Sequence, residues 1–413
     1  MLAAACDSRG PADDREVELT ISCGAVGQEF EICRQGVERW SASTGHPVKL
    51  VSTPNSATER LALYQQLLAA GASDIDVLQV DVIWPAILAP HLLDLGAAEG
   101  SAVNEHFPAL VENNTVDGRL VALPWFADVG LLYYRRDLLE KHGEDVPTTW
   151  RELTDTAARI QAAERAAGSD RLWGYVWQGR AYEGLTCNAL EWVTSHGGGT
   201  IVDGQGRVTI NNAAAVRALE EAAGWVGAIS PPGVLNYAEE ESRGVFQSGQ
   251  AVFMRNWPYA WALAQSEDSP VRGQVGVAPL PAGSGGRPAA TLGGWQLAVS
   301  RYSRHPRLAS ELVTYLTGVA EQKRRAIHGA FQPTIPALYE DPEVLDANPF
   351  FARLAGALDA ATPRPSAATG VHYNRVSNAF ASAVHAVLSG ERDAAEAVAA
   401  LDRQLRELLG EGS

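Results

Sequence analysis

The sequence predicts an α/β protein with mainly parallel sheets flanked by helices and a helical C-terminal region. Three observations predict it. Short strand-like segments alternate with amphipathic helical segments, which implies right-handed crossovers between parallel strands. The chain has 413 residues, enough for roughly two to three domains at about 150 residues each. Its hydrophobic residues, 46% of the total, are sufficient for large packed cores, and the last hundred residues show helical patterning.

The chain begins with a β-α-β-α-β series. Apolar residues alternate along residues 17–23, which predicts a strand, and recur at helical spacing along residues 30–40. A second strand is predicted at residues 48–51, a second helix at residues 61–68 and a third strand at residues 77–80. Ligands of such sheets collect at the carboxyl ends of the strands, so the loops after these strands are candidate binding segments.

A second α/β series follows from about residue 131. Its expected elements are helices near 149–166, 185–196 and 213–228, a strand near 172–177, a hairpin around 203–206, a short acidic helix at 239–241, and strands at 251–255 and 296–299.

Composition excludes several functions. The net charge of -16 opposes a phosphate-binding surface, so nucleic acid is not expected as a partner. The run at residues 196–199 (HGGG) resembles a lipase oxyanion loop, but no serine stands in a nucleophile elbow. Phosphate-loop, dinucleotide and zinc-protease motifs do not occur. We therefore expect no catalytic residue, no cofactor and no metal site.

The N-terminus resembles the end of a lipoprotein signal. Small residues precede Cys6, which would become the lipidated residue, although the charged and longer apolar parts of such a signal are missing. The polar tract 7–16 then predicts a flexible tether. Residues 1–16 are thus expected to be a signal remnant and tether, against the alternative of an accidental alanine-rich tail.

Three further cysteines lack the spacing of a metal site. Cys23 ends the first strand and Cys33 lies on the apolar side of the first helix, so a disulfide could join them in an oxidising compartment. Burial of both as small hydrophobic residues is the preferred expectation. Cys187 has no evident partner.

Tryptophan is abundant, with 11 residues, and several stand beside Gly, Pro or Asn in expected loops. These loop tryptophans are Trp84, Trp125, Trp257 and Trp295. A sugar site needs flat aromatic surfaces for the apolar ring faces, together with carboxylate, amide and guanidinium groups for the hydroxyls. The mixture of loop tryptophans with Asp, Asn and Arg favours such a site over simple core filling.

Four stretches carry a family resemblance. They are residues 81–85 (DVIWP), 123–135 (LPWFADVGLLYYR), 248–258 (SGQAVFMRNWP) and 293–299 (GGWQLAV). With these stretches the chain resembles a family 1 extracellular solute-binding protein of an ABC sugar importer, closest to the trehalose/maltose-binding branch. The resemblance spans nearly the whole chain, and it is more specific for the family than for the sugar.

The resemblance implies a two-lobe periplasmic-binding-protein (type II) fold that closes on a sugar. The expected lobes are residues 7–124 plus 280–318, and residues 125–279 plus 319–413. The chain is expected to cross between them near residues 124–128, 279–281 and 317–321.

The resemblance also implies nine sugar-binding residues. Asp81 and Asp128 would accept hydrogen bonds from hydroxyls, and Glu29 and Arg60 align less securely beside them. The remaining five are Trp257, Tyr259 and Trp295 as ring-stacking groups, Gly294 as close-lying backbone, and Arg364 as a hydroxyl-bonding group. Phe126 departs from the tyrosine that relatives often carry. The alternatives are helix caps for the aspartates, a surface ion pair for Arg364, and packing for the aromatic residues.

The function so implied is that of a non-enzymatic, lipid-anchored, extracytoplasmic monomer. It would capture an α-linked glucose disaccharide such as trehalose, maltose or sucrose and deliver it to the membrane permease of an ABC transporter. One alternative is a glycoside hydrolase with a carboxylate pair in the cleft. Another is a binding protein for a different solute, such as an oligosaccharide, a polyol or a glycerophosphodiester.

Overall fold

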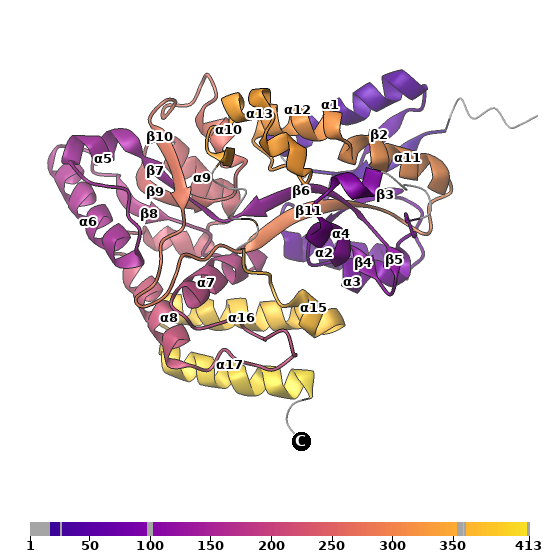
Figure 1. Ribbon diagram of the computed structural model, residues 1–413. Helices are drawn as coiled ribbons and strands as arrows, with labels where there is room; N and C mark the ends of the chain where they lie inside the picture. The colour runs from indigo at the N-terminus through magenta and orange to yellow at the C-terminus, as the bar shows by residue number, and fades with distance from the viewer. Residues whose placement is uncertain (1–16, 25–26, 97–101, 353–357, 359–360, 411–413) are drawn as a thin grey trace, which may run out of the picture.

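The computed structural model describes residues 17–24, 27–96, 102–352, 358 and 361–410. Its strands form a five-stranded sheet, a four-stranded sheet and a small hairpin. Figure 1 shows the two large sheets in opposite halves of the molecule, each covered by helices, with β6 and β11 lying toward the middle. The described part of the chain is therefore divided into two lobes.

The first sheet has the strand order β2-β1-β3-β11-β6. Its strands are β1 (Leu19–Ser22), β2 (Val48–Leu50), β3 (Val77–Asp81), β6 (Leu123–Val129) and β11 (Leu292–Val299). The elements around it are α1 (Gly27–Thr44), α2 (Ala57–Ala69), α3 (Pro85–Leu88), η2 (Ala89–His91), η3 (Ala102–Glu105), α4 (Pro108–Asn113), the hairpin β4 (Thr115–Val116) and β5 (Arg119–Leu120), and α11 (Pro306–Thr317).

The second sheet has the strand order β10-β7-β9-β8. Its strands are β7 (Leu131–Arg135), β8 (Trp173–Val176), β9 (Ala251–Asn256) and β10 (Val275–Pro279). Its helices are α5 (Arg136–His142), α6 (Trp150–Ala166), α7 (Glu183–Ser195), α8 (Ala213–Trp225), η4 (Pro232–Asn236), α9 (Glu239–Gln247) and α10 (Ala260–Ala264).

The C-terminal region is helical, as the sequence predicts. Its elements are α12 (Val319–Gly329), η5 (Pro336–Tyr339), α13 (Pro342–Ala347), α15 (Ser366–Thr369), η6 (Gly370–His372), α16 (Tyr373–Leu388) and α17 (Ala394–Leu409). Helices α16 and α17 pack beneath α7 and α8 in Figure 1, and their apolar faces share one core with the second sheet. Helix α12 lies between the lobes, because it contacts α1 and α11 of the first lobe as well as α10 of the second lobe and α13.

Local sequence explains where the helices begin. Ser56 accepts a hydrogen bond from the backbone N–H of Glu59 and caps α2. Thr149 and Glu152 form a reciprocal capping box at the start of α6. The strands and helices predicted for both lobes are present, most of them within about four residues of their predicted ends, and the short acidic helix runs on to Gln247.

The expectation of mainly parallel sheets is wrong for the second lobe and only half correct for the first. Strands β1, β2 and β3 are parallel, but β11 is antiparallel to both β3 and β6. In the second sheet only the β8–β9 pair is parallel. The cause is the path of the chain. It returns from the second lobe and enters β11 beside the C-terminal end of β3, so β11 runs antiparallel to β3.

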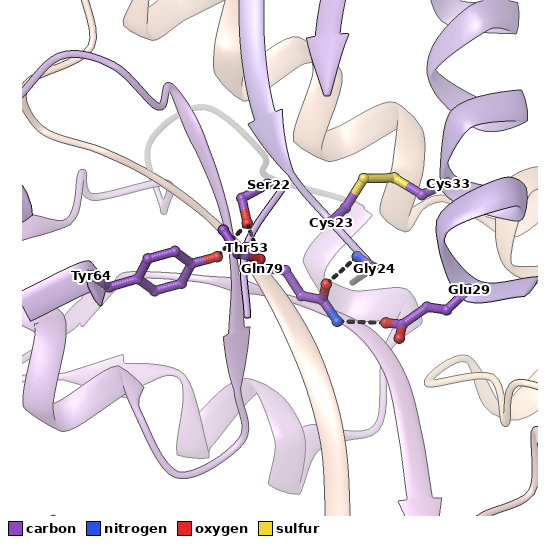
Figure 2. The surroundings of a disulfide bond; sticks show 8 residues. All are labelled: Ser22, Cys23, Gly24, Glu29, Cys33, Thr53, Tyr64 and Gln79. Atoms are coloured by element: carbon purple, nitrogen blue, oxygen red, sulfur yellow. Dashed lines mark hydrogen bonds between the residues drawn. A yellow bond between two sulfur atoms is a disulfide. The ribbon is translucent and has the colours of Figure 1, made fainter. Parts of the chain in front are cut away.

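The preferred expectation for the cysteines is also wrong. Cys23 and Cys33 form a disulfide, drawn in Figure 2, although both side chains are buried. The end of β1 packs directly on α1 and brings the two Cα atoms to 6.3 Å, within the range that a disulfide spans. Cys187 is a buried free thiol.

The predicted lipid attachment site, Cys6, and the predicted tether at residues 7–16 lie outside the described residues. Among residues 17–410, leaving out the short undescribed stretches, no helix has the length and apolar character needed to cross a bilayer. Within the same part of the chain, no cluster of His, Cys, Asp and Glu could hold a metal ion.

Candidate functional site

A cavity of about 170 Å³ lies between the two sheets. All nine residues named from the sequence line it: Glu29, Arg60, Asp81, Asp128, Trp257, Tyr259, Gly294, Trp295 and Arg364. They come from the starts of α1 and α2, the end of β3, strands β6 and β11, the loop after β9, and the loop before α15. The structure thus gathers them into one site from segments far apart in the sequence.

Arg364 joins the two halves of the cavity wall. Its Nη2 donates to Oδ1 of Asp81 at 2.7 Å and its Nη1 donates to Oε1 of Glu183 at 2.8 Å. The hydroxyls of Tyr373 and Ser377 donate to the same Glu183 carboxylate at 2.5 and 2.6 Å. Arg364 is only 4% exposed, so it forms a buried bridge and not the surface ion pair of the alternative reading.

The electrostatics of this bridge are strong. Burial raises the pKa of Asp81, and the charge of Arg364 opposes that rise. Burial alone would lower the pKa of Arg364, but Asp81 and Glu183 hold it well above the ordinary value. Asp81 also accepts a hydrogen bond from the backbone N–H of Ile83 at 3.2 Å. Arg364 therefore stays charged, with Nε lacking a partner among the described residues.

Asp128 has an unmet hydrogen-bonding capacity. Its side chain is 7% exposed, and Oδ1 has no partner within the described part of the chain. Burial, followed by the nearby charges of Glu29 and Asp81, raises the pKa of Asp128 well above its ordinary value. Burial of a carboxyl oxygen without a hydrogen-bond partner costs free energy, so Oδ1 of Asp128 is free to form a hydrogen bond with a polar group that enters the cavity.

Glu29 and Arg60 lie on the first-lobe side. Oε1 of Glu29 accepts a hydrogen bond from Nε2 of Gln79 at 2.6 Å. Nε of Arg60 donates to the carbonyl of Pro54 at 3.1 Å, and its guanidinium lies 4.7 Å from the ring centre of Trp295. Nη1 of Arg60 is buried and has no partner among the described residues. Both residues, which aligned less securely, therefore also lie at the cavity.

The aromatic residues divide into two groups. Trp257, Tyr259 and Trp295 line the cavity and are partly buried. Trp84 and Trp125 are each 1% exposed and fill the core, so the expectation that they contribute to the sugar site instead of the core is wrong. Trp125 and Trp295 also stand in strands, not loops, because the glycine and proline beside them do not interrupt β6 and β11.

Polar partners fix the orientation of the cavity aromatics. Nε1 of Trp257 donates to Glu239 at 3.3 Å, and the guanidinium of Arg255 lies 3.8 Å from the Trp257 ring centre. The Tyr259 hydroxyl donates to Oε1 of Glu240 at 2.7 Å. These contacts hold flat apolar faces beside charged groups, the combination that sugar rings require.

Gly294 supports the site through its backbone conformation. Its φ is +126°, and a Cβ there would lie 2.6 Å from the carbonyl oxygen of Phe126. Only glycine permits this close approach of β11 to β6. The Gly294 carbonyl accepts from the Val82 N–H at 3.0 Å, so it is already engaged within the protein.

Matches to known proteins can be judged against this geometry. Residues 25–323 match the bacterial extracellular solute-binding proteins as a family. The chain belongs to this family. A probable ABC transporter-binding protein of Deinococcus radiodurans is 52% identical over 398 residues, covering 96% of this chain and 94% of the relative.

Solved structures agree with this solute-binding fold. A maltose-bound structure of Thermotoga maritima MalE3 has 43% identity and a TM-score of 0.90, covering 95% of this chain and 100% of that one. A solute-binding protein of Agrobacterium vitis with bound D-mannitol has 21% identity and a TM-score of 0.83, covering 96% and 99%. The family resemblance and the two-lobe periplasmic-binding-protein fold are thus confirmed.

Family membership also settles the class of activity. The solute-binding family supplies the substrate-binding components of ABC transporters, and no enzyme family is indicated. The family is extracellular, so this solute-binding protein acts outside the cytoplasm.

Sequence reasoning missed several cavity residues. They are Tyr182, Glu183, Glu239, Glu240, Arg243 and Phe331, among others. The acidic run at the start of α9 was visible in the sequence, but helical periodicity could not show that Glu239 and Glu240 face the cavity. Glu183 and Tyr182 begin α7, and nothing in their local sequence distinguishes them from an ordinary helix start.

Proposed function

We propose that this solute-binding protein captures an α-linked glucose disaccharide, of the trehalose, maltose or sucrose type, and delivers it to an ABC permease. The observation that carries the proposal is the single cavity lined by Trp257, Tyr259 and Trp295 together with carboxylates and guanidinium groups. Rings stack on aromatic faces, while hydroxyls donate to carboxylates and accept from arginines. The similarity to a maltose-bound structure at 43% identity supports the choice of sugar.

The nine residues have separate roles in this proposal. Asp81, Asp128 and Glu29 accept hydrogen bonds from sugar hydroxyls, and Arg364 and Arg60 donate to sugar oxygens. The unpartnered Oδ1 of Asp128 supports its role, since it is satisfied only when a donor enters the cavity. Trp257, Tyr259 and Trp295 contact the ring faces, and Gly294 keeps β11 close to β6 so that they fit.

Closure of two lobes is the proposed mechanism of capture. We infer that the lobes follow the bounds expected from the sequence, residues 7–124 plus 280–318 and residues 125–279 plus 319–413, with residues 7–16 as a tether to the first lobe and with β6 kept in the first sheet as far as Val129. The direct continuation of β6 in the first sheet into β7 in the second supports a crossing at Gly130, directly after the expected segment 124–128. Because each lobe supplies part of the contacts, the ligand binds the closed form better and shifts the population toward it.

The proposal includes the cellular setting. The mature protein would be a monomer held at the outer face of the membrane by a lipid on Cys6, with residues 7–16 as tether. Membrane contact would be through this lipid alone. The permease would recognise the closed form of the protein. Labelling of the full-length precursor with a lipid precursor, against a Cys6→Ser control, tests the anchor.

A polyol is the second candidate ligand. The cavity of about 170 Å³ is smaller than the roughly 300–1,000 Å³ of typical ligand pockets, which favours a compact solute. A mannitol-binding protein of Pseudomonas aeruginosa is 24% identical over 225 residues, covering 54% of this chain and 50% of that protein.

Titration calorimetry against trehalose, maltose, sucrose, palatinose, mannitol and ribitol tests the proposal. We expect micromolar or tighter binding of at least one disaccharide and weaker binding of both polyols. Chromatography of the recovered ligand after prolonged incubation checks that it remains intact. If only mannitol or ribitol gives a binding signal, the ligand is a polyol and not a disaccharide. Glucose in the recovered sample would indicate a glycoside hydrolase.

A further inference from the structure

The start of α1 is tied to the first sheet at two points beside the cavity. Figure 2 shows the disulfide between Cys23, which follows β1, and Cys33 of α1. It also shows the Gln79 amide, which accepts from the Gly24 N–H at 2.5 Å and donates to Oε1 of Glu29 at 2.6 Å. Glu29 lines the cavity, so these ties position a cavity residue.

Helix geometry couples the disulfide to Glu29. Cys33 lies four residues after Glu29 in α1, so both side chains project from the same face, one turn apart. The disulfide therefore fixes this face of the first two turns against the end of β1. Cys23 and Cys33 are each 1% exposed, and the cross-link lies entirely within the protein.

Gly24, which follows Cys23, is also constrained. Gly24 has a φ of +62°, and a Cβ there would lie 2.6 Å from the backbone nitrogen of Phe30. This close approach requires glycine and keeps the Gly24 N–H within reach of Gln79. The other described tie of this helix end is peripheral: the Gln28 side chain donates to the carbonyl of His328 at 2.5 Å.

We propose that the Cys23–Cys33 disulfide and Gln79 together position Glu29 for the ligand, so that affinity depends on the disulfide. The proposal rests on the sugar-binding function proposed above. Without the cross-link, the first turn of α1 is free to shift away from β1, and the Glu29 carboxylate then spends less time in its binding position. Ligand binding must pay that ordering cost, which lowers the affinity.

A double-mutant cycle tests this coupling. Affinity for the best disaccharide is measured by calorimetry for the parent, Cys23→Ala/Cys33→Ala, Glu29→Ala and the triple variant. We expect the double-cysteine variant to bind about tenfold more weakly, which is the scale of one displaced hydrogen bond to a charged group. In the Glu29→Ala background the same cysteine changes should alter affinity by less than about twofold, because the positioned group is already absent.

Stability is separated from positioning by a matched control. Val37→Ala removes a buried side chain from the same helix, one turn beyond Cys33, and lowers stability without cutting the cross-link. Its affinity should match that of the parent. Gln79→Leu, which removes the second tie, should weaken binding and show the same non-additivity with Glu29→Ala.

The outcomes distinguish this proposal from the proposed function. If the parent binds no sugar, the proposed function fails first. If the parent binds and the folded double-cysteine variant binds equally well, or loses the same factor with and without Glu29, the positioning role is wrong. Cys23→Ala/Cys33→Val, which retains more apolar volume, takes its place if the double-alanine variant does not fold.

Discussion

At the scale of single residues, the cavity is shaped by buried charges whose partners come from different elements. Arg364 bonds Asp81 at the end of β3 and Glu183 at the start of α7. Both carboxylates are more than nine-tenths buried, so each depends on the guanidinium for compensation. The same residue is therefore expected to support both the fold and the ligand.

Arg364→Met should lower the free energy of unfolding by about 3–5 kcal/mol, because it leaves two buried carboxylates without their cation. Urea denaturation measures the change. The matched control is Arg151→Met, which breaks an exposed pair with Asp155 at 3.9 Å and should cost less than about 1 kcal/mol. Equal effects of the two substitutions would contradict the assigned bridge.

Trp257→Ala should weaken every bound sugar, by about 2–4 kcal/mol, because it removes apolar contact area and not a particular hydrogen bond. Asp81→Asn should instead discriminate among sugars, since its loss depends on the hydroxyl that faces it. Calorimetry with a set of deoxy sugars separates the two patterns. A loss at Trp257 that appears with only one sugar would indicate that the ring is not a stacking surface.

Asp128 predicts a dependence of stability on pH. Burial, Glu29 and Asp81 raise its pKa in the folded chain, so the folded chain retains a proton that the unfolded chain releases at lower pH. The stability of the ligand-free protein should therefore fall as pH rises through that raised pKa.

Asp128→Asn cannot ionise, so its free energy of unfolding should decline less than that of the parent as the pH rises above the ordinary pKa of an aspartate, about 3.9. The same variant should bind sugar more weakly at pH values where Asp128 of the parent is ionised, because only there does it lose a charged acceptor. Denaturation at several pH values, with the exposed Asp346→Asn as control, checks the slope. Parallel pH profiles for the parent and Asp128→Asn would show that folding does not raise the pKa of Asp128.

At the scale of elements, sequence patterns predicted most strands and helices but not how they pair. Alternation along residues 17–23 and helical spacing along residues 30–40 correctly predicted β1 and α1. The same residues could not show the Cys23–Cys33 disulfide, because small hydrophobic packing and a cross-link make identical demands on local sequence. Strand direction was likewise hidden, since β11 reads the same in either orientation.

The disulfide should also contribute to stability at this scale. It closes a short loop, with a sequence separation of 10, and chain-entropy arguments give about 2–3 kcal/mol for a loop of this length. Cys23→Ala/Cys33→Ala should lower the free energy of unfolding by that amount in urea denaturation. An unchanged midpoint would mean that the unfolded chain is not restrained by the cross-link.

At the scale of the whole molecule, the two lobes meet around the cavity. Arg180 donates to Glu59 at 3.0 Å, and the Glu183 N–H donates to the Thr58 hydroxyl at 3.3 Å. These contacts join the starts of α2 and α7, and the Arg364 bridge lies inside them. In the proposed function, this contact between the lobes is interpreted as the closed form.

The sequence anticipated this assembly only through family resemblance. Motifs such as residues 123–135 placed Asp128 at the site, whereas composition alone reached no further than an acidic α/β protein. Glu183 and Glu239 were missed because their roles depend on lobes meeting, a relation that local periodicity does not contain. Long-range contacts thus mark the limit of the prediction.

Small-angle X-ray scattering with and without a saturating disaccharide tests the central claim, that the two lobes close on a sugar, most directly. The radius of gyration should fall on binding, toward the roughly 22 Å expected of a compact chain of this length. Arg364→Met should show a smaller change at the same degree of saturation. Superimposable curves for the parent at full saturation would contradict closure on the ligand.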